Sequence, residues 1–183
     1  MFKSEVIPPA PNLTGSAIDF LLDFAGYGWL AYGASSLFVI SHFPSPASPS
    51  ETIIGPIMRQ TFDLAGYVNA VAWSPVTPST GEVAVAAENR IALYSHDSEC
   101  STGSFGWSQN AVLVQDTKVD VLKWTASGDG IVAGGVELVL WKNTRRSWGV
   151  VWKFRNELPQ DLIGYKHVIR RTFGNCGSLS GRP

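Results

Sequence analysis

Three segments of this 183-residue chain repeat the same order of apolar runs, turns and aromatic residues. The corresponding tryptophans of two of them, Trp73 and Trp124, lie about 50 positions apart. A period of this length is typical of one four-stranded blade of a β-propeller. Such a unit cannot bury both of its apolar faces alone, so the repeat predicts an all-β chain of sheets stacked on one another.

Each unit is predicted to form strands rather than helices. In residues 68–73, alternate side chains make two faces, one from Val68, Ala70 and Ala72 and the other from Asn69, Val71 and Trp73. Both faces are mostly apolar, which is typical of a strand with another sheet packed on each side. The β-branched and aromatic residues of the units favour strands as well.

Two further runs, residues 59–64 and 110–115, are predicted as outer fourth strands. Residues 17–24 are ambiguous, because Ser16 and Asp19 form a weak capping box that would begin a helix. The repeat places Phe20 at the position of Trp73, and on that ground we expect a strand.

Turn chemistry separates the strands. Ser127-Gly128-Asp129-Gly130 is predicted as a tight turn in which both glycines can adopt positive φ. Residues 42–50, rich in Pro and Ser, and the polar residues 95–108 are predicted as surface loops between units. A further unit begins at residues 147–154 and then fails, because no second pair of apolar strands follows it.

Residues 64–75 resemble the opening of a WD repeat, and residues 124–141, which end in Leu-Trp, resemble the rest of one. The resemblance covers residues 17–153 and implies a WD-repeat β-propeller fragment of about three four-stranded blades plus a stub, not closed. The chain departs from the family pattern at Tyr67, where the family usually has His. Further departures, at positions where the family has Asp, are Ala34, Glu88 and Gly135 in the turns and Ser41, Ser95 and Lys142 after the terminal aromatic residues. We therefore expect degenerate blades.

The order of the segments resembles the N-terminal region of the rabconnectin family, the DmX-like proteins that include a subunit of the RAVE complex, and is closest to the plant members. The resemblance is carried by residues 31–40, 88–94 and 138–141. It implies a non-catalytic scaffold that promotes assembly of the vacuolar proton-pumping ATPase by bringing the soluble and membrane sectors together. Family members are much longer and hold more than one propeller.

Three blades and a stub cannot close a ring, because propellers close with four to eight blades. We expect an N-terminal arm in residues 1–16, the propeller fragment in residues 17–154, and a divergent, disordered tail in residues 155–183. The hypothesis that follows is a truncated isoform or an incomplete gene model. Its two open blade faces would favour self-association.

The composition excludes some classes of function. A net charge of -1 supplies no global field for nucleic acid or anionic membrane, so no nucleic-acid partner is expected. Cys100 and Cys176 are interpreted as free thiols of a cytoplasmic protein. No apolar signal-peptide core is visible in residues 1–11.

Residues 24–40 are apolar and uncharged, at the lower limit of length for a membrane span, but the repeat explains them better and no integral span is expected. Gly26, Gly28 and Ala31 fit a variant of the dinucleotide fingerprint. That fingerprint needs a helix where the repeat predicts a strand, so no cofactor is expected.

The histidines show no metal-ligand spacing. His42 and His96 are placed at equivalent repeat positions and interpreted as loop residues, and His167 is isolated. Cys176 has no partner His nearby that would activate a nucleophile. Two basic groups, residues 145–146 and 166–171, are interpreted as solvated, with contact to an acidic partner as the alternative.

These features predict a protein that is not an enzyme and has no catalytic, cofactor or metal site, and they assign no binding residue. The expected partners are proteins, such as subunits of the vacuolar proton ATPase or other RAVE-type subunits, with self-association through blade edges. The expected location is cytoplasmic, with peripheral attachment to endomembranes as an option. The alternatives are a fragment without independent activity and a generic protein-interaction module.

Overall fold

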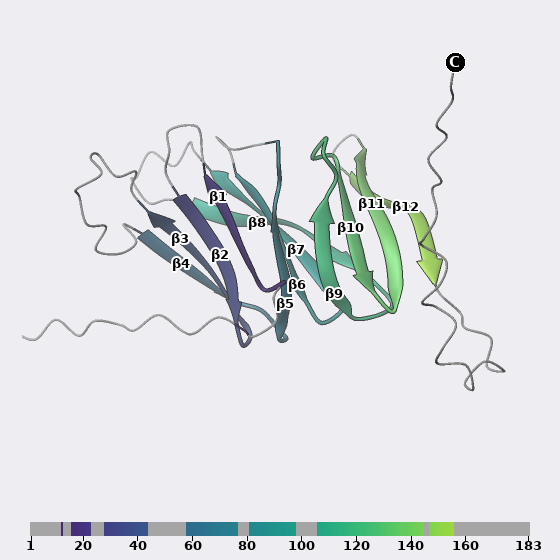
Figure 1. The fold of residues 1–183 in the computed structure, drawn as a ribbon, viewed down its shortest axis with the longest axis horizontal. Coiled ribbons are helices and arrows are strands. Elements are labelled where there is room, and N and C mark those ends of the chain that lie inside the picture. Colours follow the sequence, from purple (N-terminus) through teal and green to yellow (C-terminus); the bar gives the residue numbers. More distant parts are fainter. Residues whose placement is uncertain are drawn as a thin grey trace, which may run out of the picture.

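The computed structural model describes residues 12, 16–22, 28–43, 58–76, 81–97, 106–144 and 147–155. These residues form strands and turns and contain no helix. The strands make three four-stranded antiparallel sheets, none of which closes into a barrel. Consecutive strands pair within each sheet, as in the blades of a propeller. Figure 1 shows the three sheets following one another along the long axis of the molecule.

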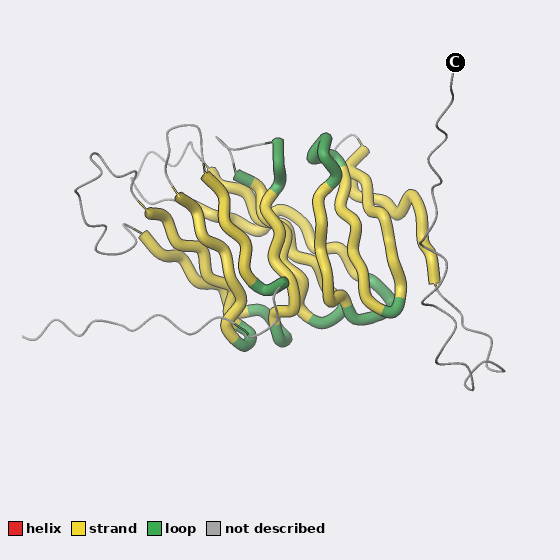
Figure 2. Tube along the Cα trace, in the orientation of Figure 1, coloured by secondary structure: helices red, strands yellow, loops and turns green. Residues whose placement is uncertain are grey.

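Each sheet is called a blade here and numbered in chain order. Blade 1 contains β1 (Ile18–Leu22), β2 (Gly28–Ala34), β3 (Leu37–Phe43) and β4 (Met58–Asp63). Blade 2 contains β5 (Val68–Trp73), β6 (Glu82–Ala87), β7 (Arg90–Asp97) and β8 (Gly106–Val114). Blade 3 contains β9 (Val119–Trp124), β10 (Gly130–Gly135), β11 (Glu137–Thr144) and β12 (Ser147–Arg155). The strands predicted near residues 17–24, 59–64 and 110–115 are confirmed as β1, β4 and β8 (Figure 2).

One assignment differs from the sequence analysis. Residues 147–154, predicted to begin a further unit, form β12, which is the outer strand of blade 3. β12 pairs with β11 from Thr144 opposite Ser147 to Glu137 opposite Arg155. The described residues therefore form three blades with four strands each. β12, which follows the third repeat in the sequence, is the fourth strand of the sheet that this repeat forms.

The strand pairing confirms the repeat alignment at the inner strands. Trp73 lies opposite Val83, and Trp124 lies opposite Ile131. In blade 1 Phe20 holds the corresponding place, opposite Leu30. Phe20 therefore occupies the tryptophan position, as the sequence predicted.

Two apolar cores lie between the blades. Alternate residues of the inner strand β5 enter different cores: Val71 and Trp73 pack toward blade 1, and Ala70 and Ala72 pack toward blade 3. This confirms that both faces of blade 2 are covered. Val68 was placed with the alanines, but it packs toward blade 1, because a β-bulge between Val68 and Ala70 shifts the alternation by one residue.

The same backbone contacts join each pair of blades. At both junctions, the β-hairpin between the second and third strands of one blade accepts two N–H groups from the segment that leads to the next blade. The bonds at the first junction run from Leu64 N to Ser36 O (2.8 Å) and from Val68 N to Ser35 O (2.9 Å). At the second junction they run from Gln115 N to Asn89 O (2.9 Å) and from Val119 N to Glu88 O (2.8 Å). Ser35 and Glu88 also share a positive φ, 58° and 54°.

The repeated tryptophan joins the inner strands. Trp73 donates from its indole nitrogen to the carbonyl of Asp19 at 3.3 Å, and Trp124 donates in the same way to Ala72 at 2.9 Å. Asp19 and Ala72 are equivalent, because each directly precedes the residue at the tryptophan position of its own blade. The first junction is strengthened further by the Asp19 carboxylate, which accepts from Trp73 N at 2.8 Å.

Within the part of the chain that is described, no helix is long and apolar enough to cross a membrane. Of the apolar residues 24–40, the described ones form β2, β3 and the turn between them.

Candidate binding site

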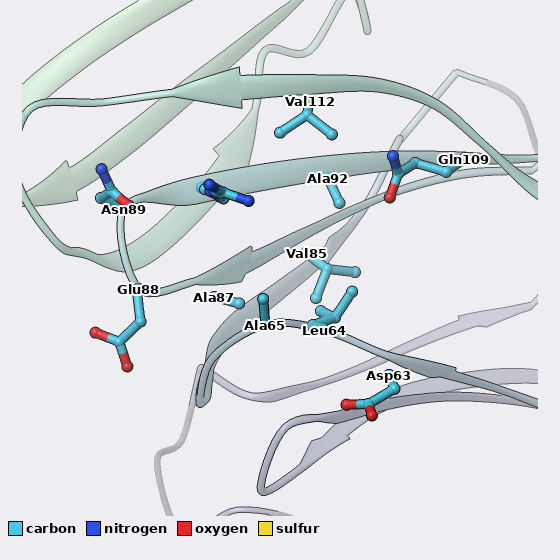
Figure 3. Close-up of a pocket in the computed structure, with 11 residues that line it drawn as sticks. Asp63, Leu64, Ala65, Val85, Ala87, Glu88, Asn89, Ala92, Gln109 and Val112 are labelled. Atoms are coloured by element: carbon cyan, nitrogen blue, oxygen red, sulfur yellow. The ribbon is translucent and has the colours of Figure 1, made fainter.

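A groove of about 440 Å³ lies where the outer part of blade 1 meets blade 2. One wall is the end of β4 and the segment after it, and the other comes from β6, β7 and β8, as Figure 3 shows. Its lining residues come from three stretches of the chain. They are Asp63, Leu64 and Ala65; Val85, Ala87, Glu88, Asn89, Arg90 and Ala92; and Gln109 and Val112.

The groove combines apolar side chains with a charged rim. Val85, Ala87 and Ala92 are buried, whereas Asp63, Glu88 and Arg90 are exposed. No nucleophilic Ser, Cys or His is among the described lining residues. Such a surface suits a polypeptide segment that places an apolar side chain inward and a charged group at the rim.

Local structure orients one acidic group of the rim and leaves room for the other. Asp63 accepts a hydrogen bond from the hydroxyl of Ser36 at 3.0 Å, so its carboxylate is oriented by the turn between β2 and β3. Glu88 is the first residue of the turn between β6 and β7. A side chain at Gly66 would bring a Cβ to 2.7 Å from Cγ of Glu88, so glycine there leaves room for Glu88.

His42 and His96 lie in strands, and their interpretation as loop residues is wrong. His42 lies in β3 and stacks on Trp29, with ring centroids 4.1 Å apart. His96 lies in β7, with its centroid 5.8 Å from Trp29 and 5.5 Å from Trp107. The structure thus brings both histidines to one aromatic cluster between blades 1 and 2.

These histidines are also one position out of register with each other. In blade 1, His42 lies opposite Trp29. In blade 2, the residue opposite the corresponding Glu82 is Ser95 rather than His96. The two hairpins have turns of equal length, so counting from those turns gives the correct equivalence.

Trp107 is also held by Gln60, a residue that the sequence did not single out. The side chain of Gln60, on β4, donates from Nε2 to the Trp107 carbonyl and accepts from Trp107 N at Oε1, both at 3.1 Å. This amide pair connects the outer strands of blades 1 and 2. Only the three-dimensional juxtaposition reveals it, because Gln60 is an ordinary polar residue of an outer strand.

The turn predicted at residues 127–130 is confirmed, with Asp129 as its centre. Asp129 accepts from Thr125 Oγ1 at 3.1 Å and from the hydroxyl of Ser127, and it pairs with Lys142 at 3.1 Å. The hydrogen bonds from Ser127 and Lys142 lower the pKa of Asp129 to about 2. Gly128 has φ +68°, but Gly130 does not share a positive φ, and glycine there permits close approach instead. A Cβ at Gly130 would lie 2.9 Å from the carbonyl oxygen of Trp141.

A second charged cluster attaches β12 to blade 3. The buried carboxylate of Glu137 lies 3.1 Å from the ammonium of Lys153 and 3.8 Å from Nε of Arg155. Lys153 also pairs with Asp116, and its hydrogen bond lowers the pKa of that exposed carboxyl. The hydrogen bonds that Lys153 donates to Asp116 and Glu137 raise the pKa of Lys153. The cluster connects the start of β11, the end of β12 and the segment before β9.

No group of three or more metal-ligating side chains occurs among the residues that the structure describes. Gly28 and Ala31 of the fingerprint match lie within β2, where the dinucleotide motif requires a helix. Cys100, Cys176, His167 and the basic residues 145–146 and 166–171 lie outside the described residues. Comparison of the chain with models of protein families and with curated proteins found no match.

Proposed function

We propose that this chain is a non-catalytic WD-repeat scaffold of the rabconnectin type that takes part in assembly of the vacuolar proton-pumping ATPase. The observation that carries the scaffold part is the repeated junction, in which Trp73 and Trp124 join successive blades in the same way. The pump part rests on the resemblance of residues 31–40, 88–94 and 138–141 to that family.

The groove between blades 1 and 2 supports binding rather than chemistry. Its described lining pairs an apolar floor with Asp63, Glu88 and Arg90 at the rim. A scaffold needs such a surface on a rigid support, and the paired strands around the groove supply one. The location proposed with this function is cytoplasmic, with peripheral attachment to endomembranes.

The test is capture of pump subunits by the tagged full chain in cells of a plant. We expect the chain to co-purify with soluble-sector subunits, and Arg90→Glu to weaken that capture because it reverses a rim charge. Asn143→Glu is the matched control, since Asn143 is exposed on β11 of blade 3 and does not line the groove. Failure to capture any pump subunit would show that the pump assignment is wrong.

The second candidate is a truncated isoform that competes with a longer scaffold. It is favoured by exposed apolar residues in the two end blades, among them Phe20 of β1 and Trp152 of β12. A competing isoform would bind pump subunits or the longer protein without restoring acidification in cells that lack the scaffold. A functional scaffold would restore it. A generic interaction module would capture other proteins in place of pump subunits.

A further inference from the structure

The inner strand of each blade presents two rows of alternate side chains. The row that faces the preceding blade is called the leading row here; it contains Val71 and Trp73 on β5 and Leu122 and Trp124 on β9. The row that faces the following blade is the trailing row; it contains Asp19 and Leu21 on β1 and Ala70 and Ala72 on β5. Leading rows pack on trailing rows at both junctions within the chain.

Among the described residues, one row of each kind has no blade against it. The leading row of β1 consists of Ile18, Phe20 and Leu22, which are 42 to 62% exposed. The trailing row of β9 consists of Val121 and Lys123, which are both exposed. Phe20 stands at the position of Trp73 and Trp124, and Lys123 stands at that of Asp19 and Ala72.

The open face of blade 3 extends from the trailing row to its outer strand. Strand pairing puts Val121, Leu138 and Phe154 in one line across the sheet, and the neighbouring line ends at Trp152. These four large apolar side chains are 39 to 52% exposed. Trp152 and Phe154 stack with an interplanar angle of 8° and a centroid distance of 6.0 Å. This contiguous apolar surface on an outer face is the kind that marks an interaction site.

We propose that the open face of blade 3 binds the leading row of β1 in a second copy of this chain, head to tail. The contact continues an interface that the chain already makes twice within itself, with a leading row packed on a trailing row. The chain carries both halves of that interface, so a second copy supplies the matching surface. The inference is independent of any role at the proton pump.

The arrangement closes with two copies. The described residues of each copy contribute three blades, so two head-to-tail contacts give a ring of six blades, which is within the four to eight of known propellers. Reciprocal contacts of this kind are related by two-fold symmetry and cover both exposed rows. A dimer of finite size is therefore expected rather than a growing filament.

The first experiment is sedimentation velocity of the full chain over a wide range of concentration. We expect a dimer that dissociates on dilution, and we expect Phe20→Asp and Phe154→Asp each to give a monomer, because each puts a charge into the contact. Val114→Asp is the control, since Val114 is an exposed apolar residue of β8 outside both rows. Lys123→Ala should tighten the dimer, because alanine stands at the equivalent position of the second junction. Circular dichroism shows whether each variant keeps its strands.

The second experiment tests the direction of the contact. One preparation carries Phe20→Cys and the other carries Lys123→Cys, both with Cys100 and Cys176 replaced by Ser. With a short bis-maleimide reagent, the mixture should form cross-linked dimers and each preparation alone should not. A monomer at all concentrations, or cross-linking of Phe20→Cys to itself, would overturn the proposal. Head-to-tail cross-linking together with sedimentation of species larger than a dimer would overturn the six-blade closure.

Discussion

The indole nitrogen of Trp124 donates to the Ala72 carbonyl across the second blade junction at 2.9 Å. Trp124→Phe keeps an aromatic ring there but removes the donor, so this hydrogen bond across the junction is lost. We expect the free energy of unfolding to fall by about 1 kcal/mol, measured by urea denaturation of the dilute chain. Trp152→Phe is the control, because Trp152 is exposed, and it should change stability by less than about 0.5 kcal/mol. Equal effects of the two substitutions would contradict the role of the indole.

Glu88 has a φ of 54°, in the left-handed region that costs an ordinary residue about 1–2 kcal/mol. Asn adopts this region more readily than Glu, so we expect Glu88→Asn to raise the free energy of unfolding by about 0.5–1 kcal/mol. The backbone carbonyl that accepts from Val119 is unchanged by the substitution. Ser35→Asn makes the matched change in the blade 1 hairpin, where φ is 58°. If both variants were less stable than the protein, backbone strain at Glu88 and Ser35 would not limit the free energy of unfolding.

At the scale of elements, the turn between β9 and β10 gives a pH prediction. The pKa of Asp129 is about 2 in the folded chain, against an ordinary value of 3.8. A carboxyl with a depressed folded pKa stabilises the fold above its unfolded pKa, and this stabilisation is lost as the pH falls from about 4 toward 2. We therefore expect the stability difference between the protein and Asp129→Asn to shrink over that window. The measurement is urea denaturation at a series of pH values, with carboxyl NMR of Asp129 reporting its pKa directly.

The strands could be predicted from the sequence because their apolar alternation and the repeat reinforce each other. Phe20 shows this, since periodicity alone left its segment between helix and strand and the repeat decided correctly. The bulge after Val68 could not be predicted from the sequence. Both faces of β5 are mostly apolar, so moving Val68 from one face to the other leaves the hydrophobic pattern almost unchanged. His42 and His96 were mis-aligned for a related reason. Similar side chains near the strand ends suggest that the two positions are equivalent, whereas the hairpin turns set the register.

Pairing between elements was the less predictable level. β12 has the same kinds of residues as the other strands, so its sequence alone does not indicate which sheet it joins. In the structure β12 pairs with β11, and Glu137 contacts Lys153 and Arg155 at one end of that pair. The groove was missed for the same reason, since its lining comes from three stretches that only the packing of blades 1 and 2 brings together.

At the scale of the whole molecule, stability is distributed along a line of blades. Blade 2 is covered on both faces, and the side chains of Val83 to Ala86 in β6 are completely buried. Among the described residues, blades 1 and 3 each have one junction with another blade. In stacked units of this kind, stability is approximately the sum of the units and of the contacts between neighbours. The middle blade therefore has two stabilising contacts and each end blade has one.

This difference predicts the order of amide hydrogen exchange. In the dilute chain, the amides of β6 should exchange most slowly, because opening them requires the loss of both junctions. The amides of β1 and β12, each at the edge of an end blade, should exchange first by local opening. At high concentration the head-to-tail contact covers the leading row of β1 and the open face of blade 3, so exchange of β1 and β9 should slow while that of β6 stays the same. Equal protection of all three blades at low concentration would contradict the nearest-neighbour picture, and protection of β1 that does not depend on concentration would count against the dimer.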